Sequence, residues 1–179
     1  MAFHVMGTGS ARPEHVVTND DLSRFLDTDD EWISSRTGIS SRRCCTTETC
    51  SDLAEAAARA ALDNAGVAAS ELDLIICSTI TADDLTPSCA AVVQERIGAS
   101  CPAFDLNAAC AGFVFALDVA HGYFARGAAQ RVLVVSAEKM SRMVDWTERS
   151  VSVLFGDGAG AVVLGAGGES PLYTKLTTR

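Results

Sequence analysis

The residue best suited to chemistry is a cysteine placed where an expected strand gives way to an apolar helix. Cys110 follows the strand expected through 104–106 and the small-residue turn 107–109, and it opens a helix expected from about 110 to 126. Unpaired N–H groups and the positive end of a helix dipole stabilise a thiolate at such a position and offer donors to a developing oxyanion. Since this helix is apolar on nearly all sides, we expect it to be buried, with Cys110 at the bottom of a pocket.

A nucleophilic cysteine normally works with a base or an orienting histidine. His121 lies further along the same helix, about 16 Å away at 1.5 Å per residue. His4 falls in the first strand and His15 in a loop beside a proline. If Cys110 is catalytic, its base therefore comes from outside this chain. The alternative is an ordinary packing thiol, which we expect for Cys77, Cys89 and Cys101.

A second constellation combines an aromatic ring with basic side chains. Arg36 follows Trp32 by one helical turn, so the pair can stack on a flat aromatic group and bind its phosphates. The alternative is a half-buried tryptophan with Arg36 in a surface ion pair. Further arginines that could hold an anionic ligand are Arg42, Arg43 and Arg149.

Two glycine-rich stretches and one cysteine cluster do not predict sites. A proline follows Gly7-Thr8-Gly9 and the third glycine is missing, while 156–160 leads into an expected strand and not a helix. Neither stretch has the strand–glycine–helix context of a dinucleotide site. Cys44, Cys45 and Cys50 lack a second pair or a nearby histidine, so we expect no metal.

Strand-length apolar runs alternate with helix-length patterns, which is typical of an α/β fold with a mainly parallel sheet flanked by helices. Capping-box patterns begin helices at Thr18 and Thr49, and Gly66 and Gly98 end helices. Toward the end, the pattern predicts strand, turn, strand over 151–164, and a last strand over 172–178. Further strands are expected through 74–77 and 132–135, and a further helix from about 88 to 97.

Composition excludes several classes of protein. The chain has 179 residues, 48% of them hydrophobic, and a formal charge of −9. Disorder is excluded, and the negative field disfavours nucleic acid. No apolar run approaches the ~20 residues of a membrane span, and no secretory signal is recognised. Seven cysteines, an odd number, suit free thiols in a reducing compartment, so we expect a cytoplasmic protein without a membrane partner.

Three motifs in order resemble beta-ketoacyl-[acyl-carrier-protein] synthase III, of the thiolase superfamily. They are Glu31-Trp32-Ile33 with 36–39, the segment 105–113 around Cys110, and 155–161. The match covers what would be the N-terminal half of a family member. It implies one half of a five-layered αβαβα architecture, with a nucleophile-carrying half over 1–165 and a connector leading to the next strand over 166–179.

The resemblance implies that Cys110 accepts an acyl group from acyl-coenzyme A. The complete family enzyme then decarboxylates malonyl-acyl carrier protein and condenses it with that acyl group, giving 3-oxoacyl-carrier protein and initiating fatty acid synthesis. Coenzyme A thioester is thus a substrate, and no tightly bound cofactor is expected. Implied partners are acyl-CoA, acyl carrier protein and a second copy in a homodimer.

The same resemblance assigns the remaining site residues. Trp32 falls on the position that stacks on adenine, Arg149 on its partner across the ring, and Thr28 and Arg36 on the cofactor entrance. Phe155 should line the tunnel to the cysteine. Thr86 falls where the dimer partner closes the acyl pocket, and its small size predicts tolerance of primers longer than acetyl.

The family's histidine and asparagine, which assist decarboxylation, belong to the other half. We therefore expect these residues alone to be acylated at most, and not to condense. Two alternatives stay open: a related O- or N-acyltransferase that does not decarboxylate, and a non-catalytic partner subunit that shapes a dimer pocket.

Overall fold

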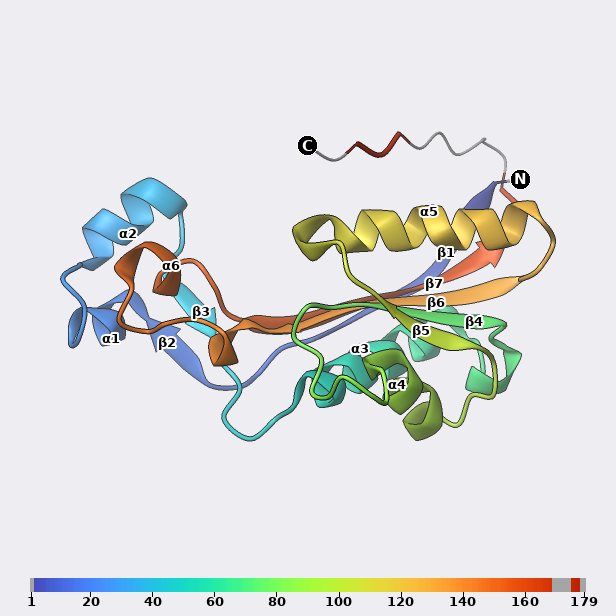
Figure 1. The fold of residues 1–179 in the computed structure, drawn as a ribbon, viewed down its shortest axis with the longest axis horizontal. Coiled ribbons are helices and arrows are strands. Elements are labelled where there is room, and N and C mark those ends of the chain that lie inside the picture. The colour runs from blue at the N-terminus through green and yellow to red at the C-terminus, as the bar shows by residue number, and fades with distance from the viewer. Residues whose placement is uncertain (1, 169–174, 178–179) are drawn as a thin grey trace.

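The computed structural model describes residues 2–168 and 175–177, and its centre is a five-stranded sheet (Figure 1). The sheet has the order β1-β7-β6-β4-β5. Its strands are β1 (Phe3–Ala11), β4 (Leu74–Ser78), β5 (Ala103–Leu106), β6 (Arg131–Lys139) and β7 (Asp157–Ala166). β4 pairs in parallel with β5 and β6, whereas β7 is antiparallel to both β6 and β1. Only β7 thus runs against the other strands of the sheet, so the sheet is mixed, and the predicted α/β class is confirmed.

The strand predicted over 151–155 is wrong. A short helix, α6 (Arg149–Ser152), occupies this stretch, and the Glu148 side chain caps it by accepting a bond from the Ser150 amide at 3.0 Å. Most of the glycine-rich stretch 156–160, predicted as a turn, instead forms the first part of β7, which pairs with β1 on one side and β6 on the other. Periodicity over so short an apolar run does not separate a strand from a helical turn.

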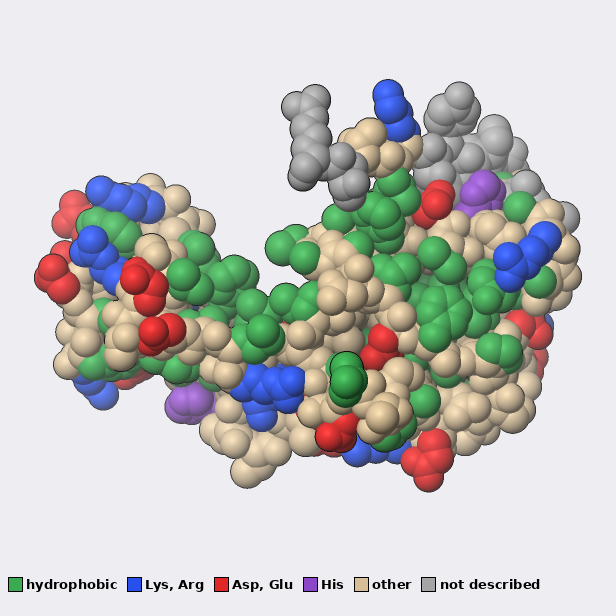
Figure 2. All heavy atoms as spheres, viewed as in Figure 1, with side chains coloured by type: hydrophobic (Ala, Val, Ile, Leu, Met, Phe, Trp, Pro, Cys, Tyr) green, Lys and Arg blue, Asp and Glu red, His purple; other side chains and the backbone are tan. Residues whose placement is uncertain are grey.

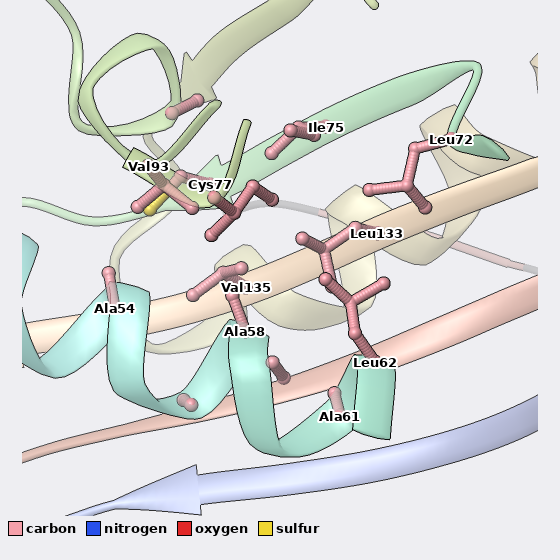
Figure 3. Close-up of a cluster of buried hydrophobic side chains, with 14 of the residues drawn as sticks. Ala54, Ala58, Ala61, Leu62, Leu72, Ile75, Cys77, Val93, Leu133 and Val135 are labelled. Carbon is pink, nitrogen blue, oxygen red and sulfur yellow. The ribbon is translucent and has the colours of Figure 1, made fainter. Parts of the chain in front are cut away.

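Helices cover both faces of the sheet, with α3 (Cys50–Ala65) and α4 (Cys89–Ile97) on one face and α5 (Gly112–Ala125) on the other (Figure 1). As predicted, Thr49 caps α3, and glycines in the left-handed region end α3 and α4; Ser88 caps α4. Small side chains of α3 pack with strand side chains in the core that Figure 3 shows. A Cβ on Gly9 of β1 would lie 2.3 Å from the Ala57 carbonyl oxygen, so glycine permits this close strand–helix approach.

The prediction that α5 is buried on nearly all sides is wrong within the described chain. Gly112, Ala116, Ala120 and Phe124 form its buried face against the sheet. On another face, Val114 is 50% exposed. The apolar composition of the helix is greater than contact with one sheet requires, and the described residues cover only one side of it.

A small lobe lies beyond one end of the sheet (Figure 1). We define it as residues 16–43 and 144–156. It contains β2 (Val16–Thr18), α1 (Asn19–Ser23), α2 (Asp30–Thr37), β3 (Ser41–Arg43) and α6, and the predicted capping box at Thr18 is present. Its core consists of Leu22, Leu26, Ile33 and Val153, with Val17, Trp32 and Trp146 packed against them.

Three 3-10 turns complete the described elements: η1 (Ala69–Glu71), η2 (Ala109–Ala111) and η3 (Met140–Arg142). β7 continues to Ala166, one residue past the boundary expected at 165. Most of the strand predicted over 172–178 lies outside the described residues. Within the described ranges, no helix has the length and apolarity needed to cross a membrane.

Candidate active site

A tight elbow between β5 and α5 presents Cys110. Cys110 lies in η2, just before α5 begins, and Ala109 adopts a left-handed φ of +47°. Such a conformation is uncommon for a residue with a Cβ and is found preferentially at functional sites. Within the described chain, no side chain caps the start of α5, and the Gly112 N–H bonds to the Ala109 carbonyl in η2.

The sequence predicted Cys110 at the bottom of a pocket. In the described chain Cys110 is instead exposed. The predicted helix start is also early, because Cys110 precedes α5 by one 3-10 turn. The reason is the partial cover of α5: a pocket floor needs walls on both sides, and the described residues pack on one face of the helix only.

Gly112 fixes the position of this elbow on the sheet. A Cβ at this residue would lie 1.9 Å from the Ser78 hydroxyl at the end of β4. Ser78 is buried. Glycine therefore lets α5 start directly against the sheet, which the sequence analysis did not anticipate.

The remaining cysteines are ill suited to nucleophilic chemistry. Those predicted to be packing thiols, Cys77, Cys89 and Cys101, are buried as expected. Burial, together with the charge of Asp157, raises the pKa of the Cys45 thiol to about 12. Among the described residues, no group of histidine, cysteine or carboxylate side chains is arranged to hold a metal ion.

Two of the histidines contact residues at the ends of β1 and β7. His4 at the start of β1 contacts the Gly167 carbonyl at 3.0 Å through Nδ1, and the His121 ring lies 6.3 Å from that of Phe3. Neither of these two contacts involves Cys110.

The small lobe brings the predicted nucleotide-binding residues together. The guanidinium carbons of Arg36 and Arg149 each lie 4.5 Å from the Trp32 ring centroid. Arg149 Nη1 also donates to the Asp27 carbonyl at 2.6 Å. Trp32 is half-buried and, with Arg36, borders a shallow pocket of about 230 Å³. An aromatic ring with two cations beside it suits a ligand that combines a flat base with phosphate.

Thr28 belongs to the same lobe and follows Asp27 in the chain. Its hydroxyl oxygen is buried and has no hydrogen-bond partner among the described residues. The neighbouring Asp27 carbonyl receives the Arg149 bond. The lobe therefore gathers all four residues predicted for the nucleotide end of a ligand.

Two other arginines considered for anion binding have structural partners instead. Arg42 is only 6% exposed and donates to Val17 O, to Asn19 Oδ1 and to Val153 O. Burial lowers the pKa of its guanidinium. Arg43 Nη1 donates to two backbone carbonyls, those of Pro13 and Glu14, at 3.0 Å. The sequence could not distinguish a structural arginine from an anion-binding arginine here, because the partners of Arg42 and Arg43 are distant along the chain.

The two residues predicted for the acyl pocket lie in separate loops. Phe155 is half-buried between α6 and β7, and Thr86 is exposed in the loop after β4. That loop borders a pocket of about 550 Å³, which also includes Asn107 from the segment before Cys110. Glu138 holds the beginning of the loop by accepting a bond from the Ile80 amide at 2.9 Å and another from the Thr81 hydroxyl.

Asp157 is a residue that the sequence analysis missed. It is 8% exposed at the start of β7, and its carboxylate accepts bonds from the Cys45 amide and from the amide and hydroxyl of Ser141. The only sequence signal was its place in the glycine-rich motif 156–160, where we considered phosphate binding and not loop anchoring.

Comparison with known proteins shows which proteins this chain resembles. A profile of 3-Oxoacyl-[acyl-carrier-protein (ACP)] synthase III matches residues 104–178. The beta-ketoacyl-[acyl-carrier-protein] synthase III of Vesicomyosocius okutanii is 55% identical over 173 residues, which are 96% of this chain and 55% of that protein. The chain is thus similar to a beta-ketoacyl-[acyl-carrier-protein] synthase III over nearly all of its own length and over about half of that protein's length.

Solved structures of synthase III proteins support the same conclusion. The Aquifex aeolicus protein superposes with a TM-score of 0.92 at 47% identity, covering 94% of this chain and 55% of that one. The Pseudomonas aeruginosa protein gives 0.89 at 43% identity, covering 94% and 53%. The fold is therefore thiolase-like, and the chain spans about half the length of the synthase III relatives it matches.

Proposed function

We propose that this chain is the nucleophile-carrying, N-terminal half of a beta-ketoacyl-[acyl-carrier-protein] synthase III. In this proposal Cys110 accepts an acyl group from acyl-coenzyme A. The observation that carries it is the exposed Cys110 on a strained elbow, beside the uncapped start of α5. The group of Trp32, Arg36 and Arg149 supports coenzyme A as the donor, because it suits an adenine with phosphates.

The proposed first step is a transthioesterification. The Cys110 thiolate attacks the thioester carbonyl, and the positive end of the α5 dipole stabilises the developing oxyanion. The new bond joins the Cys110 sulfur to the acyl carbon, and the bond from that carbon to the coenzyme A sulfur breaks. Coenzyme A leaves as a thiolate and takes a proton from solvent. No oxidation or reduction takes place.

In the complete enzyme, we propose that malonyl-acyl carrier protein is decarboxylated and its carbanion attacks the acyl carbon on Cys110. The product is 3-oxoacyl-carrier protein, which initiates fatty acid synthesis. The histidine and asparagine that assist this step would come from the other half. Acyl carrier protein is thus a proposed partner of the whole enzyme, which we place in the cytoplasm as a homodimer.

We further propose that Thr86 shapes the far end of the acyl pocket from the dimer partner, with Phe155 lining the approach to the sulfur. The exposed position of Thr86 is compatible with a contact between subunits. A threonine leaves more volume than an aromatic side chain, so full-length enzyme should accept primers longer than acetyl. Strict preference for acetyl-CoA over four- and five-carbon acyl-CoA thioesters would contradict this assignment.

Mass spectrometry of the intact chain after incubation with acetyl-CoA tests the first step. We expect the addition of one acetyl group, located on Cys110 by peptide mapping and absent from Cys110→Ser. Cys45→Ser is the matched control, because this thiol has a raised pKa and should not contribute. An acetyl group on another residue, or none, would overturn the proposal for this chain, as would 3-oxoacyl product formed without the other half.

A further inference from the structure

One buried carboxylate joins three segments near the small lobe. Asp157 Oδ2 accepts bonds from the Cys45 amide and the Ser141 hydroxyl, each at 2.6 Å, and Oδ1 accepts from the Ser141 amide at 2.7 Å. Cys45 follows β3, Ser141 lies in η3, and Asp157 begins β7 opposite Lys139 of β6. The carboxylate thus closes the base of the segment that leaves β6 and returns as β7.

This segment, residues 140–156, carries Arg149 and Phe155. The Ser141 carbonyl accepts a bond from the Trp146 indole at 3.0 Å, and Trp146 packs against the core of the small lobe. The same core contacts Trp32. A continuous set of contacts therefore runs from Asp157 through Ser141 and Trp146 to the lobe.

The end of this segment that precedes β7 is also held by close contacts with β3. A Cβ on Gly156 would lie 2.8 Å from the Arg43 carbonyl oxygen, and Arg42 donates to the Val153 carbonyl at 3.1 Å. With the base held by Asp157 and the return held by β3, α6 has a defined place in the lobe. From that place Arg149 reaches both the Trp32 ring and the Asp27 carbonyl.

We propose that Asp157 is a positioning residue for the nucleotide end of the thioester substrate. It acts through Ser141 and the 140–156 segment to hold Arg149 against Trp32, and it touches no substrate itself. This inference rests on the proposed use of coenzyme A. Asp157 would thus contribute to substrate binding although it neither stacks on the base nor contacts a phosphate.

The three bonds require a carboxylate in particular. All three partners donate, two of them backbone N–H groups that cannot reverse their direction. An asparagine has one acceptor oxygen, so its NH₂ group would face a donor. Asp157→Asn therefore keeps the size of the side chain and disturbs the anchor.

The experiment compares Asp157→Asn with Asp73→Asn in the whole 179-residue chain. Asp73 also accepts two backbone N–H bonds, from Gln130 and Arg131, and takes part in none of the lobe contacts. Three quantities are measured: coenzyme A affinity by calorimetry, the rate of Cys110 alkylation by iodoacetamide, and the two tryptophan indole signals in ¹H–¹⁵N spectra.

We expect Asp157→Asn to weaken coenzyme A binding by about tenfold. The indole signals of Trp146 and Trp32 should move, and Cys110 alkylation should stay within about twofold of the parent. Asp73→Asn should leave affinity and indole signals unchanged. Equal loss of affinity in both variants, or unchanged indole signals in Asp157→Asn, would overturn the positioning role.

If Asp157→Asn does not fold, Ser141→Ala replaces it, since this change removes only the hydroxyl bond. A smaller loss, about threefold, is expected then, and no loss would overturn the proposal. Failure of the parent chain to bind coenzyme A would instead contradict the proposed function. The indole signals would still decide whether Asp157 holds the segment.

Discussion

Arg149 of α6 and Trp32 of α2 meet in the small lobe, with the guanidinium carbon 4.5 Å from the ring centroid. Because Arg149 is also bonded to the Asp27 carbonyl, it lies over the ring in a defined place. A flat base that stacks on Trp32 must either share the ring with Arg149 or enter between the two. The two side chains that meet here thus come from distant parts of the chain.

Trp32→Ala should weaken coenzyme A binding by about tenfold, because loss of stacking and cation–π contact removes roughly 1–2 kcal/mol. Calorimetry measures the change. Phe25→Ala is the control. Phe25 belongs to the same lobe but is 58% exposed, and it is not among the side chains that form the core of the lobe or pack against it. Equal weakening by both changes would show a general effect on the lobe and contradict a specific role of Trp32.

Iodoacetamide should label Cys110 ahead of the other six cysteines in the native chain. Cys110 is the exposed cysteine, whereas Cys45 is half-buried with a pKa raised to about 12 and the rest are buried. Only the thiolate reacts, so Cys45 should be slow near neutral pH. Peptide mass spectrometry over time measures the order, and Cys110→Ser should lose the fast phase. A rate at Cys110 no greater than that of a model thiol would favour a structural role for this residue.

The free energy of unfolding should decrease at alkaline pH. A hydrogen bond with Cys89 and burial raise the pKa of the Cys50 thiol well above its ordinary 9.0. A group with a raised pKa in the folded state contributes stability below its unfolded pKa, and this contribution is lost as the pH rises above that value. Urea midpoints measured between about pH 7.5 and about pH 10.5 should therefore decrease above about pH 9.

Cys50→Ser provides the control for that decrease, because a serine hydroxyl does not ionise in this range. Its urea midpoint should be lower than that of the parent at neutral pH but should depend less on pH above 9.0, the ordinary thiol pKa. A parent midpoint that stays constant throughout would refute the contribution of the buried thiols.

Two glycines should respond to alanine in opposite directions. At Gly9 the new Cβ would lie 2.3 Å from backbone atoms of α3, so Gly9→Ala should lower the free energy of unfolding by about 2–3 kcal/mol. At Gly122, in the last turn of α5, nothing lies within 4 Å of the new Cβ, so Gly122→Ala should raise the free energy of unfolding by about 0.5–1 kcal/mol. Chemical denaturation measures both. Similar effects of the two changes would contradict the close approach of β1 to α3.

The helix ends were predictable because capping acts within a few residues. Thr18 and Thr49 accept bonds from amides three positions on, and Gly66 and Gly98 take left-handed conformations that favour glycine. α6 was not predictable in the same way. Its four residues are held by Glu148 and by the distant Arg42, and neither partner is visible in an apolar run read alone.

In the candidate site, too, contacts within one element could be predicted from the sequence, whereas contacts between distant segments could not. Arg36 follows Trp32 by one helical turn, so their contact could be foreseen from spacing, whereas the approach of Arg149 came only from the family resemblance. The position of Cys110 near a helix start was predicted, but its exposure was not, because the cover of α5 depends on tertiary contacts. Asp157 was missed since its three donors come from other segments.

β7 is bonded along both edges, to β1 and to β6, and begins at the small lobe (Figure 1). Between the lobe and α5 the surface is hollowed and bordered by hydrophobic side chains (Figure 2). A ladder of this kind resists stretching, so the strands hold the small lobe in a constant position at the end of the sheet. If the proposed function holds, a thioester on a long, nucleotide-ended arm could contact both Trp32 and Cys110, whereas a short thioester could contact only Cys110.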